Sequence, residues 1–392
     1  MSKIWGGVFT KKTSEKLNEF MSAENLEVDS KLIPYEIKGS KAHVKMLTEQ
    51  GILKQEEGVA IIKALEEIEQ EWKNGKFKLK EELEDVHMNV ESAVSEKTQH
   101  GKKMHTARSR NDQVNLVMRM YMKDAIKEIK EQVKKLQEAF LVQAKKEIVI
   151  PGYTHTRVAQ PLKISMWAEG YVESLDNDVE RLEQLYNRVD KNPLGACALT
   201  GTSWNIDPKK TAKELGFKEV EKNPFNTISS RGELEAELLF VISLISMKLS
   251  RMSEELIWLS YVGIVELPEE YCTGSSIMPN KKNPDGLELI RGKSGRIYGN
   301  LVSVLTILKG LMSGHNADTQ ETKKPVIDSV EQITACLDTM SEIIEKIKWN
   351  ESKIKEELEK GNAYATEKAN ELVKKGMSFR EAHEQVGKSL KK

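Results

Sequence analysis

Apolar residues recur at every third or fourth position along most of the chain, which is the spacing of one face of an α-helix. The longest of these patterns runs from 113 to 147 without a proline that would break a helix. Four more long patterns cover 162–189, 232–260, 284–312 and 325–349. The pattern at 232–260 is apolar on more than one side, as in a helix buried inside a bundle or against other subunits. We therefore predict an all-α fold with a central bundle of five long helices, in an oligomeric protein.

The patterns on either side of this region are shorter. In the first part of the chain, four glycines interrupt them: Gly39, Gly51, Gly58 and Gly75. The last part holds short, charged patterns that end in GKSLKK. We predict an N-terminal helical domain at 1–105, a central long-helix bundle at 106–350 and a short C-terminal helical domain at 351–392. Strands are expected to be minor.

Charge and cysteine content narrow the classes of partner. Sixty Lys and Arg residues against 61 Asp and Glu residues give a formal net charge of −1, so no global field recruits nucleic acid or an anionic membrane. The three cysteines are scattered and fit neither a disulfide framework nor a zinc site. No apolar run reaches the roughly 18 residues of a membrane span, and the N-terminus lacks the apolar core of a signal peptide. We predict a cytoplasmic protein.

Three segments depart from the helical pattern and carry polar chemistry. The first, HTARSRNDQV at 105–114, precedes the longest helix, and Asn111 or Asp112 is expected to cap that helix. A capped helix start does not explain Arg108 and Arg110, because cations at a helix N-terminus oppose the helix dipole. The two arginines therefore suggest an anion bound between them, and a purely structural helix start is the alternative.

The second segment, PGYTHTRVAQP at 151–161, is predicted to be a loop between two long helices. The imidazole of His155 titrates near neutral pH and suits proton transfer, and the Thr154 hydroxyl beside it could orient a carboxylate. A single loop histidine is more often structural than catalytic. His155 therefore becomes a site candidate only in company with the other segments.

The third segment, TGSSIMPNKKNPDG at 273–286, combines hydroxyls, lysines and amides. Asn283 and Pro284 have the pattern of an N-cap followed by the first residue of a helix. The N-terminus of that helix points back into the segment and favours anions. A flexible, lysine-rich surface loop is the alternative, but it leaves the density of hydroxyls and cations beside a helix start unexplained.

The stretch GSSIMPNKKNP resembles the signature of the fumarase/aspartase superfamily, whose members eliminate fumarate from a substituted succinate. Within that superfamily, HTARSRNDQV, PGYTHTRVAQP, KIWGGVF near the start and DVHMNVES at Asp85 are similar to argininosuccinate lyases. The resemblance runs from Trp5 to about Gly387. It implies a homotetramer with a core of about twenty long helices, five from each subunit, and active sites that are each assembled from three subunits.

The reaction that the resemblance implies is the reversible β-elimination of argininosuccinate to arginine and fumarate, a step of arginine biosynthesis and the urea cycle. By similarity, Ser275 is the base that removes the proton, with Ser276 as the alternative. Lys281 would help to activate the serine and to stabilise the aci-carboxylate. His155 would exchange a proton with the departing nitrogen, with Glu288 holding its orientation.

The same resemblance implies a set of substrate-binding residues and no metal or organic cofactor. The substrate-binding set is Asn111, Thr154, Gln320, Lys323, Ser109, Arg110, His87, Asn283 and His315.

The sequence departs from the family pattern at several positions. His315 stands where the family has tyrosine, Ala317 where it has a basic residue, and Val8 where arginine is usual. Ser22 and Asn25 are the two alternatives for a serine that normally contacts substrate. The C-terminal domain is shorter than that of the family and looks truncated.

Two other functions stay open. Another fumarate-releasing lyase, such as adenylosuccinate lyase, shares the serine loop, although ARSRNDQV favours the argininosuccinate branch. A non-catalytic, crystallin-like structural homologue is the second alternative, and the intact set of Ser275, His155, Lys281 and Glu288 argues against it. Release of fumarate from argininosuccinate or adenylosuccinate separates the three.

Overall fold

The structure is a computed structural model that describes residues 14, 16–17, 20 and 25–390. Trp5, Val8 and Ser22, which the sequence analysis singled out, lie outside the described residues. Asn25 is the first residue of helix α2, Asn25–Ser30. The described part of the chain is mostly helical, which confirms the predicted fold class.

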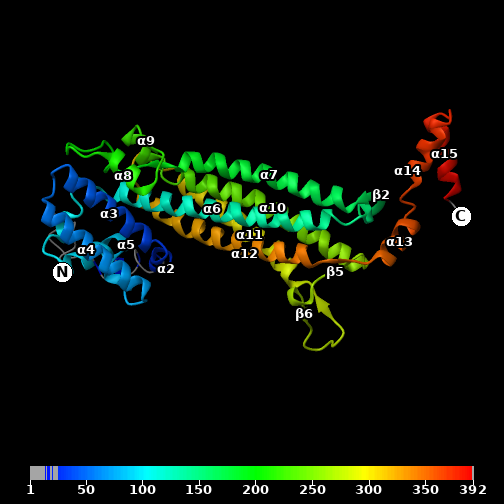
Figure 1. Cartoon of the computed structure of the whole chain (residues 1–392), viewed down its shortest axis with the longest axis horizontal. Coiled ribbons are helices and arrows are strands. Elements are labelled where there is room, and N and C mark those ends of the chain that lie inside the picture. Colours follow the sequence, from blue (N-terminus) through cyan, green and yellow to red (C-terminus); the bar gives the residue numbers. More distant parts are fainter. Residues whose placement is uncertain (1–13, 15, 18–19, 21–24, 391–392) are drawn as a thin grey trace. The chain divides into compact units, whose positions relative to one another are not determined.

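Five long helices are present where the hydrophobic pattern predicted them (Figure 1). The longest, α6, has 35 residues and a length of about 50 Å at the usual rise per residue. The five helices are α6 Arg110–Ala144, α7 Ile164–Val189, α10 Glu233–Val262, α11 Asp285–Leu308 and α12 Lys323–Lys346.

Shorter α-helices precede and follow the five long helices, as predicted, and two more, α8 and α9, lie between α7 and α10. The α-helices are α3 Ile33–Glu49, α4 Gln55–Lys73, α5 Val86–Lys97, α8 Pro208–Leu215, α9 Pro224–Ser229, α13 Glu351–Lys360, α14 Ala365–Lys374 and α15 Phe379–Ser389. Short 3₁₀ turns are η2 Glu81–Leu83, η3 Gly101–Lys103, η4 Glu269–Tyr271 and η5 Ala317–Thr322.

Two of the four glycines do not interrupt a helix, so that part of the prediction is wrong. Gly39 lies within α3, where an added Cβ would meet Leu116 Cδ2 at 2.9 Å, and its absence lets α3 approach α6 closely. Gly58 lies within α4 for a similar reason. Gly51 and Gly75 follow the ends of α3 and α4 with φ of +70°, a conformation that favours glycine.

The strands are minor, as predicted. Six of them have two residues each: β3 Lys191–Asn192, β4 Glu219–Val220, β5 Val265–Glu266, β6 Thr273–Gly274, β7 Lys282–Asn283 and β8 Lys348–Trp349. They form the parallel pair β3–β4 and the antiparallel pairs β5–β8 and β6–β7.

The segment 151–161 is not a loop, which corrects the prediction. Strands β1, Val149–Thr154, and β2, Arg157–Lys163, form an antiparallel hairpin in which Pro151 pairs with Pro161. Proline cannot donate to a ladder, but each strand of a two-stranded ribbon has one free edge at which proline is tolerated. Both prolines therefore lie within the strands of a hairpin between α6 and α7.

The chain forms two compact units, each built from separate stretches. Unit 1 comprises residues 1–127, 183–240 and 300–329. In its interior, α3 packs on α4 and α5 through buried side chains that include Ile37, Leu47, Leu65 and Val90.

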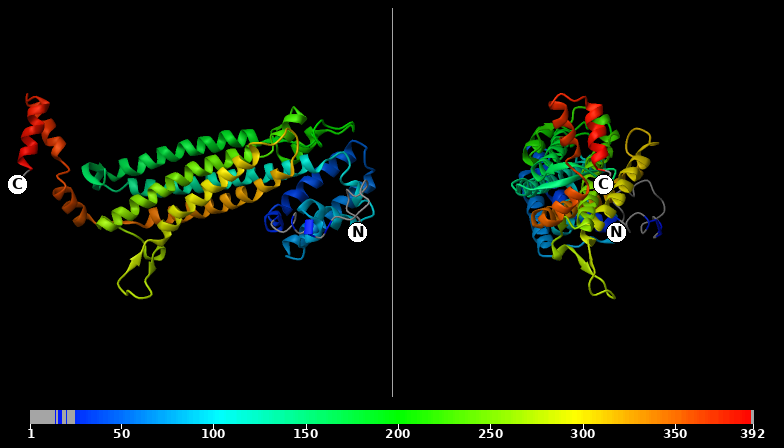
Figure 2. Two further views of the ribbon diagram at one scale, coloured as in Figure 1. Left: turned by 180° about the vertical axis from the view of Figure 1, so that it is seen from behind. Right: turned by 90° about the vertical axis from the view of Figure 1, so that its right-hand side faces the viewer.

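Unit 2 comprises residues 128–182, 241–299 and 330–392. Its part of the helix bundle is shown in Figures 1 and 2. It contains a cluster of aromatic rings in which the centroid of the Trp167 ring lies 5.3 Å from that of Phe140 and 5.6 Å from that of Trp349. Gln143 of α6 donates to the Ile344 carbonyl at 2.7 Å and accepts from Trp349 Nε1 at 3.0 Å. These contacts fix α6, α7 and the end of α12 against one another.

No helix in the described part of the chain has the length and apolar character needed to cross a membrane.

Candidate functional site

The start of α6 is capped by Ser109. Its Oγ accepts a hydrogen bond from Asn111 N at 3.3 Å, while its own backbone N–H donates to Asp112 Oδ1 at 3.0 Å. These reciprocal bonds have the logic of a capping box. The prediction that Asn111 or Asp112 is the cap is therefore wrong, because the helix begins at Arg110 and the residue before it takes that role.

Asn111 and Asp112 instead hold a neighbouring loop of unit 1 against the helix start. Asp112 Oδ2 accepts from the backbone N–H groups of Gly195, at 3.1 Å, and Cys197, at 2.9 Å. Asn111 Nδ2 donates to the Ala198 carbonyl at 3.1 Å. The polar residues that follow the arginines thus order the backbone around them.

The two arginines already face acceptors of their own chain. Arg110 pairs with Asp85 at 3.1 Å through Nε and donates to Gln113 Oε1 at 2.8 Å through Nη1. Arg108 is buried, and its Nη1 donates to Ser40 Oγ at 3.1 Å. Its Nε and Nη2 have no hydrogen-bond partner among the described residues. The geometry by itself therefore does not require a bound anion between them.

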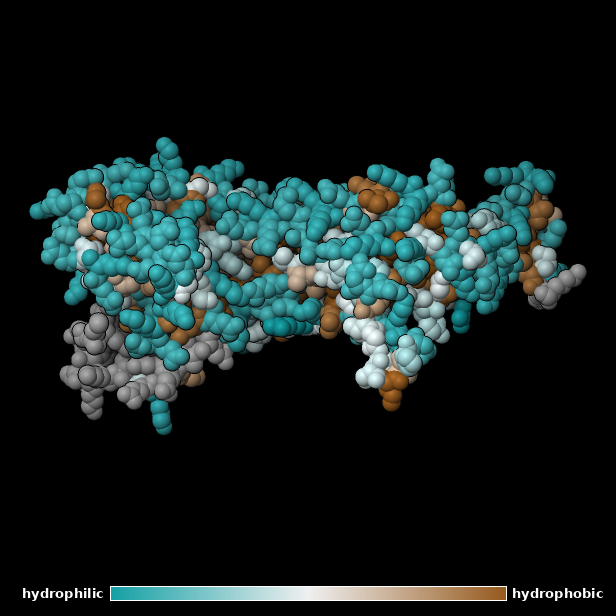
Figure 3. Space-filling view, turned by 60° about the horizontal axis from the view of Figure 1, so that its bottom comes forward, coloured by the Kyte–Doolittle hydropathy of each residue, from teal (hydrophilic) through white to brown (hydrophobic). Residues whose placement is uncertain are grey.

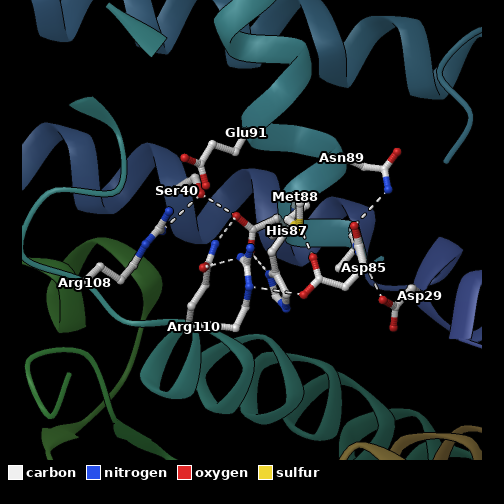
Figure 4. Close-up of polar contacts among 12 residues, drawn as sticks. Asp29, Ser40, Asp85, His87, Met88, Asn89, Glu91, Arg108 and Arg110 are labelled. Atoms are coloured by element: carbon white, nitrogen blue, oxygen red, sulfur yellow. Dashed lines mark hydrogen bonds and ion pairs between the residues drawn. The ribbon is translucent and has the colours of Figure 1, made fainter. Parts of the chain in front are cut away.

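His87 lies in the same polar cluster, at the start of α5 (Figure 4). Its Nδ1 donates to Glu36 Oε2 at 2.5 Å, and Asp85 caps the helix by accepting from Met88 N at 2.7 Å. Burial opposes ionisation of Glu36, but the charges of His87 and Arg108 and its hydrogen bonds outweigh that effect and lower its pKa to about 2. The carboxylate is therefore ionised although it is buried.

Two further histidines near this cluster are held neutral. Burial, together with the charge of Arg108, lowers the pKa of His43 to about 3, and the pKa of His105 falls to about 3 for the same reasons. The sequence analysis missed Glu36 and His43. A signal was present, because Glu36, Ser40 and His43 follow the three- and four-residue spacing of one helix face, where a buried helix would have apolar residues.

The predicted residues near η5 lie in unit 1. Lys323 is 4% exposed and pairs with Asp29 Oδ1 at 2.5 Å, while Asp29 Oδ2 accepts from Val86 N at 3.0 Å. Gln320 is partly exposed in the 3₁₀ turn just before Lys323. Lys323 thus meets a carboxylate of its own chain.

His315, which replaces the family tyrosine, contacts an arginine that the sequence analysis missed. Arg231 Nη1 lies 3.4 Å from His315 Nδ1, and Arg231 Nη2 donates to the Thr319 carbonyl at 3.3 Å. Partial desolvation and the charge of Arg231 hold the pKa of His315 below its ordinary value. The neutral ring can accept from Arg231. Ala317, the other departure nearby, begins η5 and is exposed.

The serine segment belongs to unit 2 and forms a short ribbon that ends in an exposed loop. Ser275 Oγ accepts hydrogen bonds from the backbone N–H groups of Ile277, at 3.3 Å, and Met278, at 3.1 Å. Asn283 pairs with Thr273 in the ribbon and donates through Nδ2 to the Gly274 carbonyl at 3.4 Å. Ser275 is therefore the member of the serine pair whose hydroxyl receives backbone amides.

The helix that follows begins one residue later than predicted. The carbonyl of Pro284 accepts from Leu287 N at 3.0 Å and Glu288 N at 3.1 Å, so Pro284, rather than Asn283, is the residue before α11. The Asp285 carboxylate in its first turn accepts from the Thr273 hydroxyl. This contact ties the base of the ribbon to the helix.

His155 occupies the tip of the β1–β2 hairpin. His155 and Thr156 have φ of 53° and 58°, so the two-residue turn has positive φ at both positions, as in a type I′ turn. Such turns favour asparagine and glycine, and positive φ is an outlier for a β-branched threonine. Strained backbone of this kind clusters at functional sites. The exposed His155 and its neighbour Thr154 are thus presented at a strained tip.

The single chain does not join the four predicted catalytic side chains to one another. Among the described residues, no hydrogen bond or ion pair links His155, Ser275, Lys281 or Glu288 to another member of this set. The Glu288 carboxylate lies 4.0 Å from Arg291, and Lys281 is exposed in the loop. The described residues also contain no group of three or more His, Cys, Asp or Glu side chains that could hold a metal ion.

Because His43 is buried and neutral, the free energy of unfolding should fall as the pH is lowered. Its folded pKa of about 3 lies below the ordinary value of 6.5, so the unfolded chain takes up a proton first as the pH falls. The resulting stability is complete above about pH 6.5 and is lost progressively toward pH 3. We expect His43→Gln to reduce the slope of unfolding free energy against pH, near pH 5, by about 1.4 kcal/mol per pH unit.

Urea unfolding followed by circular dichroism at several pH values between 4.5 and 6 measures this slope. His383→Gln is the matched control, because His383 is exposed in α15 and should leave the slope unchanged. Equal slopes for the wild type and His43→Gln would show that His43 is protonated in the folded protein.

The sequence of the chain matches those of known proteins. A family model described as lyase matches residues 8–299, and one described as argininosuccinate lyase C-terminal matches residues 362–392. Argininosuccinate lyase of Syntrophus aciditrophicus is 46% identical over 99% of this chain and 82% of its own length. Argininosuccinate lyase of a Sulfurihydrogenibium species is 45% identical over 98% of this chain and 84% of its own length.

A solved structure of another lyase has a similar fold. EDDS lyase in complex with formate superposes with a TM-score of 0.83 at 29% identity, covering 96% of this chain and 76% of that protein. The sequence matches extend over both the helical core and the C-terminal helices. The chain therefore belongs to the argininosuccinate lyase family.

Proposed function

We propose that the protein catalyses the reversible β-elimination of argininosuccinate to L-arginine and fumarate. Family membership supports this reaction, and the arrangement of the serine loop is the observation that carries it. Ser275 receives two backbone N–H groups at Oγ in a loop that returns through β7 to the N-terminus of α11. That is a suitable environment for a base that must act beside developing negative charge.

The difficult step is removal of a proton from the carbon next to a carboxylate, which leaves a doubly charged aci-carboxylate. Hydrogen bonds to the deprotonated oxygen of Ser275 favour that form of the side chain. The N-terminus of α11 and the cation of Lys281 stabilise the extra negative charge on the substrate. Ser275 takes the proton, and the electron pair that remains forms the carbon–carbon double bond of fumarate.

Loss of the guanidinium nitrogen completes the reaction. As the carbon–nitrogen bond breaks, the departing nitrogen takes a proton from His155, directly or through water. Glu288 orients the imidazole. The strained turn at the hairpin tip supports this role, because it fixes the backbone of His155 at a conformational cost.

The substrate carries several carboxylates, and the proposed binding residues offer donors to them. Those from unit 1 are His87, Ser109, Arg110, Asn111, His315, Gln320 and Lys323, and those from unit 2 are Thr154 and Asn283. Since Lys323 is already paired with Asp29, the substrate would share that cation rather than meet a free one.

We further propose that the protein is a homotetramer with sites shared between subunits, acting in the cytoplasm in arginine biosynthesis and the urea cycle. The separation of the catalytic side chains in the single chain supports sharing. The surface of α11 supports close packing, since Leu289, Val302 and Leu305 are 63%, 61% and 52% exposed. Figure 3 shows separate hydrophobic patches on one face of the molecule and at the tip of the protruding serine loop.

The proposed substrate is tested by mixing the protein with argininosuccinate or with adenylosuccinate and following the ultraviolet absorbance of fumarate. We expect fumarate from argininosuccinate only, because the family resemblance includes the residues that bind the rest of that substrate. Fumarate from adenylosuccinate would assign the chain to the sister activity. Fumarate from neither substrate would favour a structural protein.

The choice of base is tested by two neighbouring substitutions. Ser275→Ala removes the hydroxyl that receives the backbone amides, so single-turnover elimination should fall by roughly 10³-fold or more while substrate binding changes by less than about tenfold. Ser276→Ala is the matched control and should cost much less. An inactive Ser276→Ala with a nearly normal Ser275→Ala would move the base by one residue.

The assembly is tested on three exposed glycines of α11. An added Cβ at Gly292, Gly295 or Gly299 meets nothing within 4 Å in the single chain, so alanine there should favour the helix by about 0.5–1 kcal/mol per site. If α11 packs closely on another subunit, the triple alanine variant should dissociate more readily.

Analytical ultracentrifugation measures this effect against Gly387→Ala, which also adds a methyl group to open space on an exposed helix. We expect the wild type and Gly387→Ala to sediment at four times 44.5 kDa and the triple variant to shift toward smaller species. A triple variant that remains tetrameric on dilution would exclude α11 as a close subunit contact.

A further inference from the structure

The carboxylate of Glu36 links three helices in the interior of unit 1. It is 1% exposed, on α3, and both of its oxygens are occupied. Oε2 accepts from His87 Nδ1 of α5 at 2.5 Å. Oε1 accepts from Ser40 Oγ at 2.6 Å and from Gln113 Nε2 of α6 at 2.7 Å. Burying an ionised group costs several kcal/mol unless hydrogen bonds offset that cost, and here three of them do.

The first consequence concerns the orientation of Gln113. An ionised carboxylate only accepts hydrogen bonds, so Gln113 must turn its amide nitrogen toward Glu36. The amide oxygen then faces away and accepts from Arg110 Nη1 at 2.8 Å. The Arg110 guanidinium is held on its other side by Asp85 at 3.1 Å. Glu36 therefore helps to fix Arg110 through Gln113.

The second consequence concerns the proton position on His87. Because Glu36 can only accept, the bond at 2.5 Å requires the proton to be on Nδ1. In the described part of the chain, Nδ1 is the only ring nitrogen of His87 that makes a hydrogen bond or ion pair. Nε2 remains available to another group. Nε2 can donate to a substrate carboxylate only when it carries a proton as well.

We propose that Glu36 is a positioning residue that orients His87 and Arg110 as a pair of donors for one substrate carboxylate. The inference rests on the proposed function, because it assigns a ligand to those two side chains. His87 contacts Glu36 directly, and Arg110 is reached through Gln113, so one buried carboxylate sets the direction of both. Figure 4 shows His87, Arg110 and Asp85 turned toward one another.

Steady-state kinetics of Glu36→Gln test this role. The substitution keeps the shape of the side chain but removes the fixed acceptor, so both donors should lose their orientation. A substrate contact made equally in the ground and transition states affects KM rather than kcat. We expect KM for argininosuccinate to rise by roughly tenfold or more, with kcat within about threefold of the wild type.

The matched control is Glu57→Gln, which removes another buried carboxylate of unit 1. Glu57 is 6% exposed and bonds to Lys103 and to Lys54 N at 3.1 Å, without touching His87 or Gln113. Its loss should lower stability but leave KM within about twofold. Equal changes in KM for the two variants would overturn the proposal, because they would reflect a general loss of buried charge.

A double-mutant cycle tests whether Glu36 acts through His87. In a His87→Gln background, Glu36→Gln should have a markedly smaller effect on KM than in the wild type, because one of the two oriented donors is already absent. Fully additive effects would contradict the inference.

Nitrogen NMR of histidine-labelled wild-type protein gives a readout that depends neither on activity nor on the folding of a variant at position 36. The signal of His87, identified by its loss in His87→Gln, should show a proton on Nδ1. A proton on Nε2 alone would overturn the inference even in an active enzyme. Absence of fumarate from the wild type would instead reject the proposed function, and with it the substrate role assigned to Glu36.

Discussion

A long helix must bury an apolar face along most of its length, and most of the polar residues that we assign to the site lie at or near the ends of such helices. Ser109 precedes α6, Ser275 lies in the segment before α11, and Lys323 begins α12. His155 lies in the hairpin between α6 and α7. These residues are far apart in the sequence, but each of them lies beside an end of a long helix. A site built from them requires several helix ends to meet.

The polar cluster of unit 1 is an exception to an apolar interior. Glu36, Arg108 and His87 are buried together, and burying charges costs several kcal/mol unless partners compensate. Hydrogen bonds to both oxygens of Glu36 provide such compensation, and neutral His43 avoids a further buried charge. The cluster lies directly against the start of α6, which carries Arg110 and Asn111. It therefore gives a rigid support to side chains that we assign to substrate binding.

Much of the fold follows from hydrophobic periodicity, because a long helix repeats its pattern many times. The five long helices were predicted within a few residues, whereas the hairpin at 151–161 was taken for a loop. Its signal is short, and two prolines obscure the strand pattern. Glu36 and His43 were missed because their partners come from α5, α6 and the segment before α6, and pairing between distant segments leaves no local trace. The division into domains at 105 and 350 stays a prediction.

The central claim is that one chain supplies the parts of a site but does not complete it. Within the described residues, His155, Ser275, Lys281 and Glu288 are not joined by hydrogen bonds or ion pairs. Subunit complementation tests this most directly: inactive Ser275→Ala and His155→Asn proteins are dissociated, mixed and reassembled, and their activity is measured. Sharing predicts that a minority of sites regain both residues and release fumarate. Verified mixed tetramers without any recovered activity would show that both residues of a site come from one chain.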